Sequence, residues 1–411
     1  MYGGKYLIIA DDFTGANDTG VQLKRRGYAT EVVFVKQRKQ LNHESLVIDT
    51  ESRYLEGEKA AEVMRQALEE VDLNVFTYII KKVDSTLRGN IAEEIRALDR
   101  IYGSELIAVA PSLPDLGRVT EGGIQKLNGR RITQTEIAGD LKRGVEEDNL
   151  AVLLGRVYEE NISLVTAGDI KKKNWLPESS RICIFDSSTN DQLKQIVREV
   201  KRTERKVLWV GTSALADTIM ELEQKTLPAM GIVGSVSSVT SQQVKAAERS
   251  GAYLVKVPMH QLIAGEKDGE CYIEEALEYL KEGRDTILLS SSSYDRGELE
   301  LAEAAGRERG WSSCRLGEYV QETLGAMTDR ILRQVKVCGI FVTGGDTAIG
   351  VLKSISASGS DIQSEIMFGI PMVKIIGGRL NGMKAITKAG AFGSEDAIKF
   401  ALRKLREREG E

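Results

Sequence analysis

The sequence predicts an α/β protein with two domains built on mainly parallel sheets, the first of which carries an antiparallel arm. Three observations predict this class. The 411 residues exceed what one ordinary hydrophobic core organises. Short apolar runs alternate with segments of helical periodicity along nearly the whole chain, which is typical of βαβ units. Polar or glycine-rich turns follow several apolar runs, and in open parallel sheets such turns form the ligand-binding edge.

In the first half, each short apolar run bounded by turn residues predicts a strand. Helices are expected at 57–71 and 90–101, where apolar residues recur at 3.6-residue spacing, and at 214–223, which follows a turn at 211–213. Residues 111–145 differ, because Pro, Gly and Thr are dense there and Lys126–Arg130 has the composition of a hairpin turn. This segment predicts the antiparallel arm. The expected strands are 6–10, 31–35, 45–49, 77–81, 106–110, 162–165, 182–185 and 206–210.

The second half repeats the α/β rhythm after a linker at 224–229, so we expect domains at 1–225 and 230–411. A cleft between two such domains is the default place for a small-molecule site. The expected strands are 253–257, 286–289, 339–343, 366–368 and 384–387, and the expected helices are 240–250, 274–281, 297–308, 319–335 and 348–356.

Composition excludes several classes of function. A net charge of −5 without a basic run argues against nucleic acid or an anionic membrane as a partner. No apolar stretch has the length of a signal peptide or a membrane span. The four cysteines lie far apart, which argues against a zinc site and a disulfide framework and predicts a cytoplasmic location. The two histidines lie in no motif, so acid–base chemistry must fall to carboxylates, lysine or water.

Charged side chains follow three of the expected strands in the first half, at 11–14, 49–53 and 82–88. Adjacent acids such as Asp11 and Asp12 repel each other, which suits a site that binds a hydroxyl or a cation. Arg53 offers a planar fork for a carboxylate, and Lys82 a point charge for a phosphate or carboxylate. Solvated surface charges are the alternative for each group alone. Together, the three strand ends predict a site for a polar, acidic small molecule.

Three glycine-rich turns follow apolar runs in the second half, at 231–240, 341–348 and 387–393. Glycine lets the backbone approach a polyphosphate, and the N–H groups at a helix start favour an anion. Asp346 could hold Mg²⁺ through water or orient a nucleophile. Each turn alone could simply link a strand to a helix, with Ser238 or Thr240 as an N-cap. Together they predict a nucleotide lying across one sheet edge, although no Walker A loop is present.

At this point the motifs resemble those of the four-carbon acid sugar kinase family, in family order and over nearly the whole chain. The resemblance implies a sugar-acid-binding first domain, a nucleotide-binding second domain and ATP-dependent phosphorylation of the terminal hydroxyl of threonate, erythronate or 3-oxo-tetronate. The motifs are ADDFTGAND (10–18), DTESR (49–53), KKVDSTLRGN (81–90), PSLPDLGRVT (111–120), GSVSSVTSQQ (234–243), FVTGGDTA (341–348) and TKAGAFG (387–393).

The resemblance also implies the site residues. Ala389 and Ala391 depart from the usual family pattern, and Ser112 and Leu113 leave the preferred acid open. Mg²⁺ would accompany ATP, with no metal-ligating side chain assigned. The implied substrate-binding residues are Asp12, Arg53, Lys82, Val83, Asp84, Ser85 and Arg88, and the implied ATP-binding residues are Ser235, Thr343, Gly344, Gly345, Asp346 and Gly390.

Phosphoryl transfer needs an aligned hydroxyl, charge neutralisation and a carboxylate that accepts a proton. We expect Arg53 and Lys82 to anchor the substrate carboxylate and Asp12 to be the base, with Asp346 as second candidate. A sensor that binds both ligands without turnover is one alternative. A phosphatase is another, although the acid expected two residues after the first is missing. The arm exposes strand edges through which the chain could form a homodimer.

Overall fold

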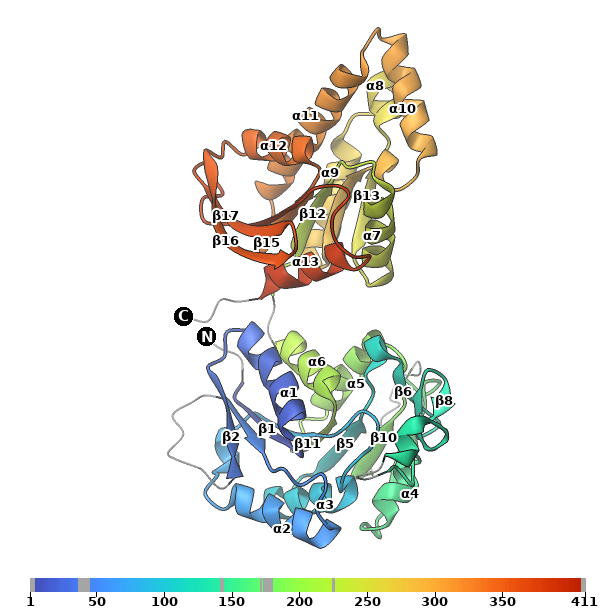
Figure 1. Ribbon diagram of the computed structural model, residues 1–411, viewed down its shortest axis with the longest axis vertical. Coiled ribbons are helices and arrows are strands. Elements are labelled where there is room, and N and C mark those ends of the chain that lie inside the picture. Colours follow the sequence, from blue (N-terminus) through green and yellow to red (C-terminus); the bar gives the residue numbers. More distant parts are fainter. Residues whose placement is uncertain are drawn as a thin grey trace. The chain divides into compact units, whose positions relative to one another are not determined.

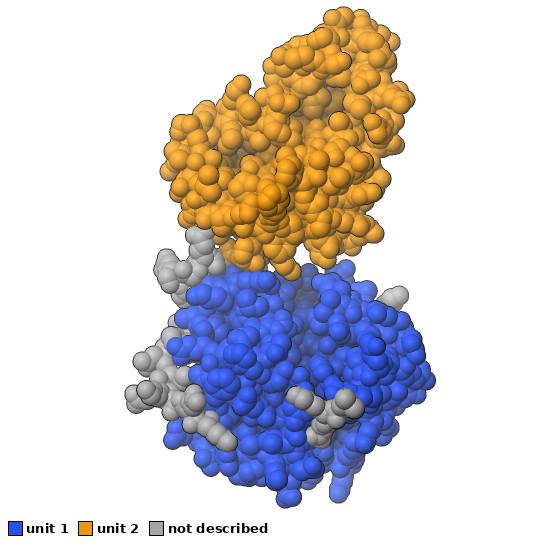
Figure 2. All heavy atoms as spheres, in the orientation of Figure 1, with its two compact units in different colours: residues 1–225, 408–411 blue, residues 226–407 orange. Residues whose placement is uncertain are grey.

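The computed structural model describes residues 4–35, 45–140, 144–170, 172, 180–223 and 226–407. The chain forms two compact units, residues 1–225 with 408–411 and residues 226–407 (Figure 2). Both units are α/β (Figure 1), which confirms the predicted fold class. Residues 224 and 225 of the expected linker lie outside the described residues, and residue 229 already begins a strand.

Within the described residues of unit 1, eight strands form one sheet in the order β2-β3-β1-β4-β11-β5-β10-β9, and every pair is parallel. Each expected strand is present, displaced by at most one residue. A parallel sheet covered on both faces needs continuous apolar runs, which is why these strands were easy to predict. The bounds are β1 Tyr6–Ala10, β2 Thr30–Phe34, β3 Ser45–Asp49, β4 Tyr78–Lys82, β5 Leu106–Ala110, β9 Ile162–Val165, β10 Ile182–Phe185 and β11 Val207–Gly211.

Helices cover both faces of this sheet (Figure 1). Along β1, Leu7 and Ile9 join one hydrophobic core with α2, α3 and α4, whereas Ile8 and Ala10 join the other with α1, α5 and α6. Successive side chains of a strand point to opposite faces, so β1 is buried throughout. The helices are α1 Phe13–Arg25, α2 Gly57–Leu68, α3 Ile91–Tyr102, α4 Leu150–Gly155, α5 Asn190–Arg202 and α6 Ser213–Glu223.

The predicted arm is a small antiparallel sheet of β6 (Arg118–Glu121), β7 (Ile124–Leu127) and β8 (Arg130–Arg131). Asn128 and Gly129 form its hairpin turn with φ of 48° and 79°, the left-handed values that an Asn-Gly turn adopts. Residues 141–143 of the segment expected to form the arm lie outside the described residues.

Unit 2 contains a mixed sheet in the order β13-β14-β12-β15-β18-β17-β16. The first five strands are parallel, and β16 and β17 form an antiparallel hairpin against β18. The expected strand 366–368 was wrong in extent, because β16 is an exposed edge strand with a polar sequence and no apolar run. The bounds are β12 Ala229–Val233, β13 Tyr253–Val257, β14 Thr286–Ser290, β15 Gly339–Thr343, β16 Gly359–Met367, β17 Ile370–Ile376 and β18 Lys384–Lys388.

The five helices expected in unit 2 are present, four of them with different bounds, whereas the helices at 259–264 and 397–406 were not predicted. Helix α11 begins earlier than expected because the Ser312 side chain accepts a hydrogen bond from the Arg315 amide and caps it. No helix among the described residues is long and apolar enough to cross a membrane. The bounds are α7 Ser238–Arg249, α8 Met259–Ala264, α9 Glu270–Lys281, α10 Gly297–Glu308, α11 Ser313–Leu332, α12 Gly345–Ser354 and α13 Ala397–Arg406.

Candidate functional site

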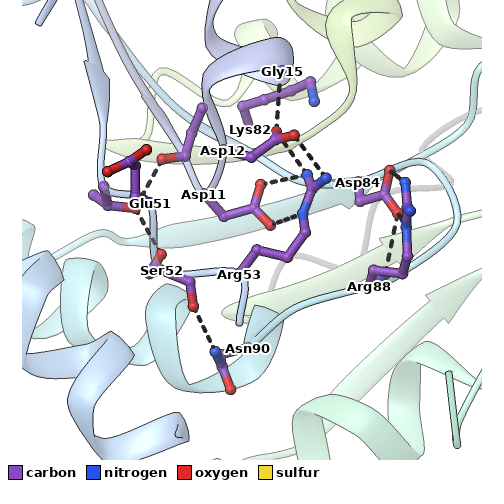
Figure 3. Close-up of polar contacts among 12 residues, drawn as sticks. Asp11, Asp12, Gly15, Glu51, Ser52, Arg53, Lys82, Asp84, Arg88 and Asn90 are labelled. Atoms are coloured by element: carbon purple, nitrogen blue, oxygen red, sulfur yellow. Dashed lines mark hydrogen bonds and ion pairs between the residues drawn. The ribbon is translucent and has the colours of Figure 1, made fainter. Parts of the chain in front are cut away.

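Three polar loops of unit 1 meet at one edge of its sheet. Strand β1 lies between β3 and β4, and all three are parallel, so their carboxyl ends lie side by side. Residues 11–12 follow β1, residues 50–55 follow β3 and residues 83–90 follow β4. Figure 3 shows Arg53 pointing toward Asp11 and Asp12, and Arg88 pointing toward Asp84.

Arg53 lies between the two adjacent acids (Figure 3). Its Nε and Nη2 donate to the two Asp11 oxygens at 2.8 and 3.0 Å, and its Nη1 and Nη2 donate to the two Asp12 oxygens at 2.7 Å each. Burial opposes the charge of Arg53, but the hydrogen bonds and negative charge of Asp11 raise its pKa above the ordinary value. The guanidinium thus offsets the repulsion between the acids. We expected this group to face a substrate carboxylate, whereas four of its hydrogen bonds hold Asp11 and Asp12.

Asp12 is also the N-cap of α1. Its Oδ1 accepts a hydrogen bond from the Gly15 amide at 3.0 Å, and a carboxylate is favourable at the positive end of a helix. A Cβ atom on Gly15 would lie 2.6 Å from Asp12 Oδ1 and 2.7 Å from Lys82 Nζ. Asp12 and Lys82 therefore approach the same point, which only glycine leaves open. The Asp12 side chain is 24% exposed, so a ligand can reach it.

Lys82, at the end of β4, is 6% exposed, and its Nζ makes no hydrogen bond or ion pair with the residues that the structure describes. Burial lowers the pKa of this ammonium, while the charges of Asp11, Asp84 and Asp12 oppose the shift. A buried ammonium without a partner is unfavourable by itself. It suits an anionic ligand that supplies the missing acceptor.

Asp84 and Arg88 pair with each other inside the third loop. Arg88 Nε donates to Asp84 Oδ2 at 2.7 Å, and Thr86 Oγ1 donates to the same oxygen at 2.5 Å. Burial raises the pKa of Asp84, but the hydrogen bonds from Arg88 and Thr86 outweigh it and lower the pKa. Two other predicted residues differ in their surroundings, since Val83 is in the hydrophobic core and Ser85 is half-buried.

The antiparallel arm braces this loop. Gln125 of β7 donates from Nε2 to the Ser85 carbonyl at 2.9 Å and to the Pro111 carbonyl at 3.2 Å. Its Oε1 accepts a hydrogen bond from Thr120 Oγ1 at 2.7 Å. The arm thereby fixes the backbone of residue 85 in addition to any role in assembly.

A buried polar network that the sequence analysis missed supports all three strand ends. Lys81 Nζ pairs with Glu94 Oε2 at 2.8 Å and donates to the Lys82 carbonyl at 2.9 Å. Ser52 Oγ donates to Glu94 Oε1 at 2.5 Å and lies 2.7 Å from Thr50 Oγ1, which donates to the Ala10 carbonyl at 2.8 Å. The network thus joins the ends of β1, β3 and β4 to α3. The signal available in the sequence was an acid on the apolar face of a predicted helix.

Asp49, the last residue of β3, is a second group that was not predicted as a site residue. Its Oδ1 accepts a hydrogen bond from the Glu51 amide at 3.0 Å, while its Oδ2 is buried without a partner in the described part of the chain. Burial raises the pKa of Asp49 to about 6. Below that pH the carboxyl is mostly neutral, whereas at neutral pH it is mostly ionised and adds to the negative charge around Asp11 and Asp12.

Gly89 combines a left-handed backbone with a close approach to the site. Its φ is +104°, and a Cβ atom there would lie 2.9 Å from Asp11 Oδ2. We expect Gly89→Ala to destabilise unit 1 by about 1–3 kcal/mol and to displace Asp11, because both strain and contact oppose the methyl group. Thermal unfolding and the KM for the ligand of this unit measure the two effects.

Gly103→Ala is the matched control, because Gly103 has a φ of +64° and nothing within 4 Å of its Cβ position. The control should lose stability through strain alone and keep its KM. An unchanged KM in Gly89→Ala would show that the contact with Asp11 does not position the site.

In unit 2 the three glycine-rich turns converge. They follow β12, β15 and β18, which are neighbours in the sheet. The Gly234 amide donates to the Thr343 carbonyl at 3.3 Å, and the Gly344 amide donates to the Lys388 carbonyl at 3.1 Å. A Cβ atom on Gly390 would lie 2.3 Å from Ser235 Oγ, so the third turn contacts the first.

Two helices open at this edge without a side-chain cap, α7 after Ser237 and α12 after Gly344. Their first amides are available to an anion, and such ends favour phosphate. Thr343 Oγ1 is buried and has no partner among the described residues. Asp346 is exposed in the first turn of α12, and Gly345 beside it is exposed too. The arrangement suits a polyphosphate.

Lys388, at the end of β18, is a further residue of this edge and was not predicted as a site residue. It is 3% exposed, and its Nζ donates to the Ala389 and Gly390 carbonyls at 2.9 Å each. Burial lowers its pKa to about 8. Through these two hydrogen bonds the side chain fixes the backbone of the third glycine-rich turn. No cluster of three or more His, Cys, Asp or Glu side chains that could hold a metal occurs in the part of the chain that the structure describes.

Comparison with known proteins agrees with a different kind of ligand site in each unit. Residues 6–219 match the family described as a sugar-binding N-terminal domain, and residues 230–398 match a nucleotide-binding C-terminal domain. Over 97% of both chains, the protein is 32% identical to a D-threonate kinase of Salmonella typhimurium. The chain belongs to the four-carbon acid sugar kinase family. This confirms the resemblance drawn from the seven motifs.

Two further matches have lower sequence identity. A D-erythronate kinase of Heliobacterium modesticaldum is 27% identical over 95% of this chain and 94% of its own. Among solved structures, a Bordetella bronchiseptica protein described as a domain of unknown function superimposes with a TM-score of 0.64 at 26% identity, covering 99% of this chain and 100% of its own. That protein crystallised with bound citrate as a domain-swapped dimer.

Proposed function

We propose that the protein is an ATP-dependent kinase that phosphorylates the terminal hydroxyl of a four-carbon sugar acid of the threonate, erythronate or 3-oxo-tetronate type. One observation carries the proposal: Asp12 Oδ1 lies 2.6 Å and Lys82 Nζ, which has no partner among the described residues, lies 2.7 Å from the Cβ position of Gly15. A proton acceptor next to an anion-binding ammonium suits a substrate that has a hydroxyl and a carboxylate. The family relatives named as threonate and erythronate kinases support the same substrate class.

In unit 1, Lys82 binds the carboxylate of the acid and Asp12 accepts the proton of the hydroxyl. Arg53 acts through Asp12, because its hydrogen bonds hold both oxygens of that carboxylate in place. The loop of Val83, Asp84, Ser85 and Arg88 completes the substrate site. Val83 contributes through its backbone, since its side chain is in the core.

In unit 2, the glycine turns cradle the triphosphate. Amides at Gly345 and Gly390 and the hydroxyls of Ser235 and Thr343 bind phosphate oxygens. Gly344 shapes the turn, because its own amide donates to the Lys388 carbonyl. Mg²⁺ is held in such sites by one or two carboxylates together with the phosphates, and it neutralises developing charge. The exposed Asp346 fits that role and is the second candidate for the base.

Phosphoryl transfer requires little covalent chemistry from the protein. It needs the hydroxyl in line with the γ-phosphate, electrostatic stabilisation and exclusion of water. The protein therefore acts mainly by holding the two ligands and by taking one proton.

We also propose that the protein works in the cytoplasm and forms a homodimer. All four cysteines are free thiols, as in reducing compartments. The Bordetella relative, whose whole chain is covered, crystallised as a domain-swapped dimer.

The decisive experiment is ADP formation with a panel of four-carbon acids, with the site of phosphorylation read by NMR. We expect ADP release to depend strictly on one or a few of these acids. Lys82→Met should abolish the acid-dependent release of ADP. It should leave nucleotide binding intact, because the substitution alters unit 1 alone. Binding of both ligands without ADP release would identify a sensor instead. Release of phosphate from a phosphorylated acid without ATP would identify a phosphatase.

A further inference from the structure

The hairpin of β16 and β17 brings its turn to the nucleotide edge of unit 2. Strand β17 pairs antiparallel with β18, with Met372 opposite Ile386 and Lys374 opposite Lys384. The start of β17 therefore lies beside the end of β18, where the third glycine-rich turn begins. The hairpin turn at residues 368–369 is thus a neighbour of Gly390 at this edge.

Two phenylalanines are exposed there. Phe368, in the hairpin turn, is 84% exposed, and Phe392, two residues after Gly390, is 41% exposed. Their rings are 6.5 Å apart between centroids and inclined by 27°. The backbone beneath them is held, because Gln243 Nε2 donates to the Phe392 carbonyl at 3.0 Å and the Gly369 amide donates to Glu365 Oε1 at 2.8 Å. Exposed aromatic faces on a fixed backbone are typical of a binding surface.

We propose that Phe368 and Phe392 form the platform on which the nucleobase of ATP stacks. The inference rests on the proposed function, since it extends the phosphate site to the rest of the nucleotide. Every nucleobase has a π-face that stacks on aromatic rings without a hydrogen-bond code. The platform therefore favours a nucleoside triphosphate over inorganic triphosphate and selects weakly between purines.

The other end of the same edge does not offer such a surface. Tyr294, after β14, donates its hydroxyl to Glu248 Oε2 at 2.9 Å. The ammonium of Lys256 lies 3.5 Å from the centre of its ring, and that of Lys245 lies 5.0 Å away. The two ammonium groups cover the Tyr294 ring, so a nucleobase cannot stack on it. The base is therefore placed on the side of the β16–β17 hairpin.

Phe368→Ala tests the platform with little risk to the fold, because the ring is almost wholly exposed. Calorimetry on the full-length protein with Mg²⁺ compares ADP with inorganic tripolyphosphate. We expect ADP binding to weaken by about 5- to 100-fold and tripolyphosphate binding to stay unchanged. Phe392→Leu, which keeps apolar packing but removes the aromatic face, should behave in the same way.

Two controls separate the outcomes. Ile362→Ala, on β16 at 76% exposure, should change neither ligand, and Ser235→Ala should weaken both. Unchanged ADP affinity in Phe368→Ala, an equal loss for both ligands, or a change in oligomeric state in place of affinity would overturn the platform. If Phe368→Ala binds both ligands as tightly as the wild-type protein, the platform is wrong and the phosphate site stands. If the wild-type protein binds neither ligand, the proposed function fails as well.

Discussion

Asp12→Asn should lower kcat by about 10²- to 10⁴-fold at saturating acid and ATP, the range that general acid–base catalysis contributes. Asparagine caps a helix as well as aspartate, so α1 should keep its bond from the Gly15 amide. What is lost is the negative charge that accepts the proton and pairs with Arg53. Steady-state kinetics gives the loss, and thermal unfolding shows that the fold is intact.

Asp18→Asn is the control for the Asp12 variant, because Asp18 is exposed on the same helix. It should leave kcat unchanged. Near-wild-type kcat in Asp12→Asn would reject Asp12 as the base and turn attention to Asp346. If Asp346 in unit 2 is the base instead, Asp346→Asn should show the larger loss of kcat.

The strands could be predicted because a strand that is buried on both faces has a nearly continuous run of apolar residues. The runs at 6–10 and 45–49 contain few polar residues and end at carboxylates, and both strands have the expected bounds. The edge strand β16 shows the opposite case. Most of its side chains are exposed, so its sequence is polar and carries no strand signal. Its pairing with β17 decides its structure, and that is a tertiary effect.

The candidate site was predictable as a set of positions but not as a set of contacts. Charged residues at strand ends indicated a site, because parallel strands present their carboxyl ends at one edge. The order β3-β1-β4, which makes 11–12, 49–53 and 82–88 neighbours, is a property of the assembled sheet. So is the pairing of Arg53 with both acids, since the planar fork could equally have faced a ligand.

Buried charges were the hardest to predict, because their partners are far away in the sequence. Lys81 and Glu94 are thirteen positions apart in the sequence, on a strand and a helix. Each follows or precedes another charged residue, so the sequence does not indicate that these two form a buried pair. Glu94 does share a helix face with Ile91, Ile95 and Leu98, all of them buried. An acid on such a face is unfavourable unless it is paired.

Glu94→Leu should therefore destabilise unit 1 by about 3–5 kcal/mol, since it leaves the ammonium of Lys81 buried without its charged partner. Lys81 is 0% and Glu94 1% exposed, so water cannot replace the lost contact. Burial raises the pKa of Glu94, with the charge of Lys81 opposing the shift, which shows how strongly this position resists a lone charge. Hydrogen–deuterium exchange measures the loss in β4 and α3, and peptides from unit 2 serve as the internal reference.

The double variant Lys81→Met with Glu94→Leu should recover most of that stability, because well-packed apolar residues replace a buried ion pair with little loss. Glu62→Leu is the matched control, since Glu62 pairs with Arg65 at 2.5 Å on the exposed face of α2, where a pair contributes about 0–1 kcal/mol. A loss in Glu94→Leu no larger than in this control would contradict the account of a desolvated pair. If the double variant is stable yet slow in turnover, then what the ion pair supplies is the position of the three strand ends that carry Asp12, Arg53 and Lys82.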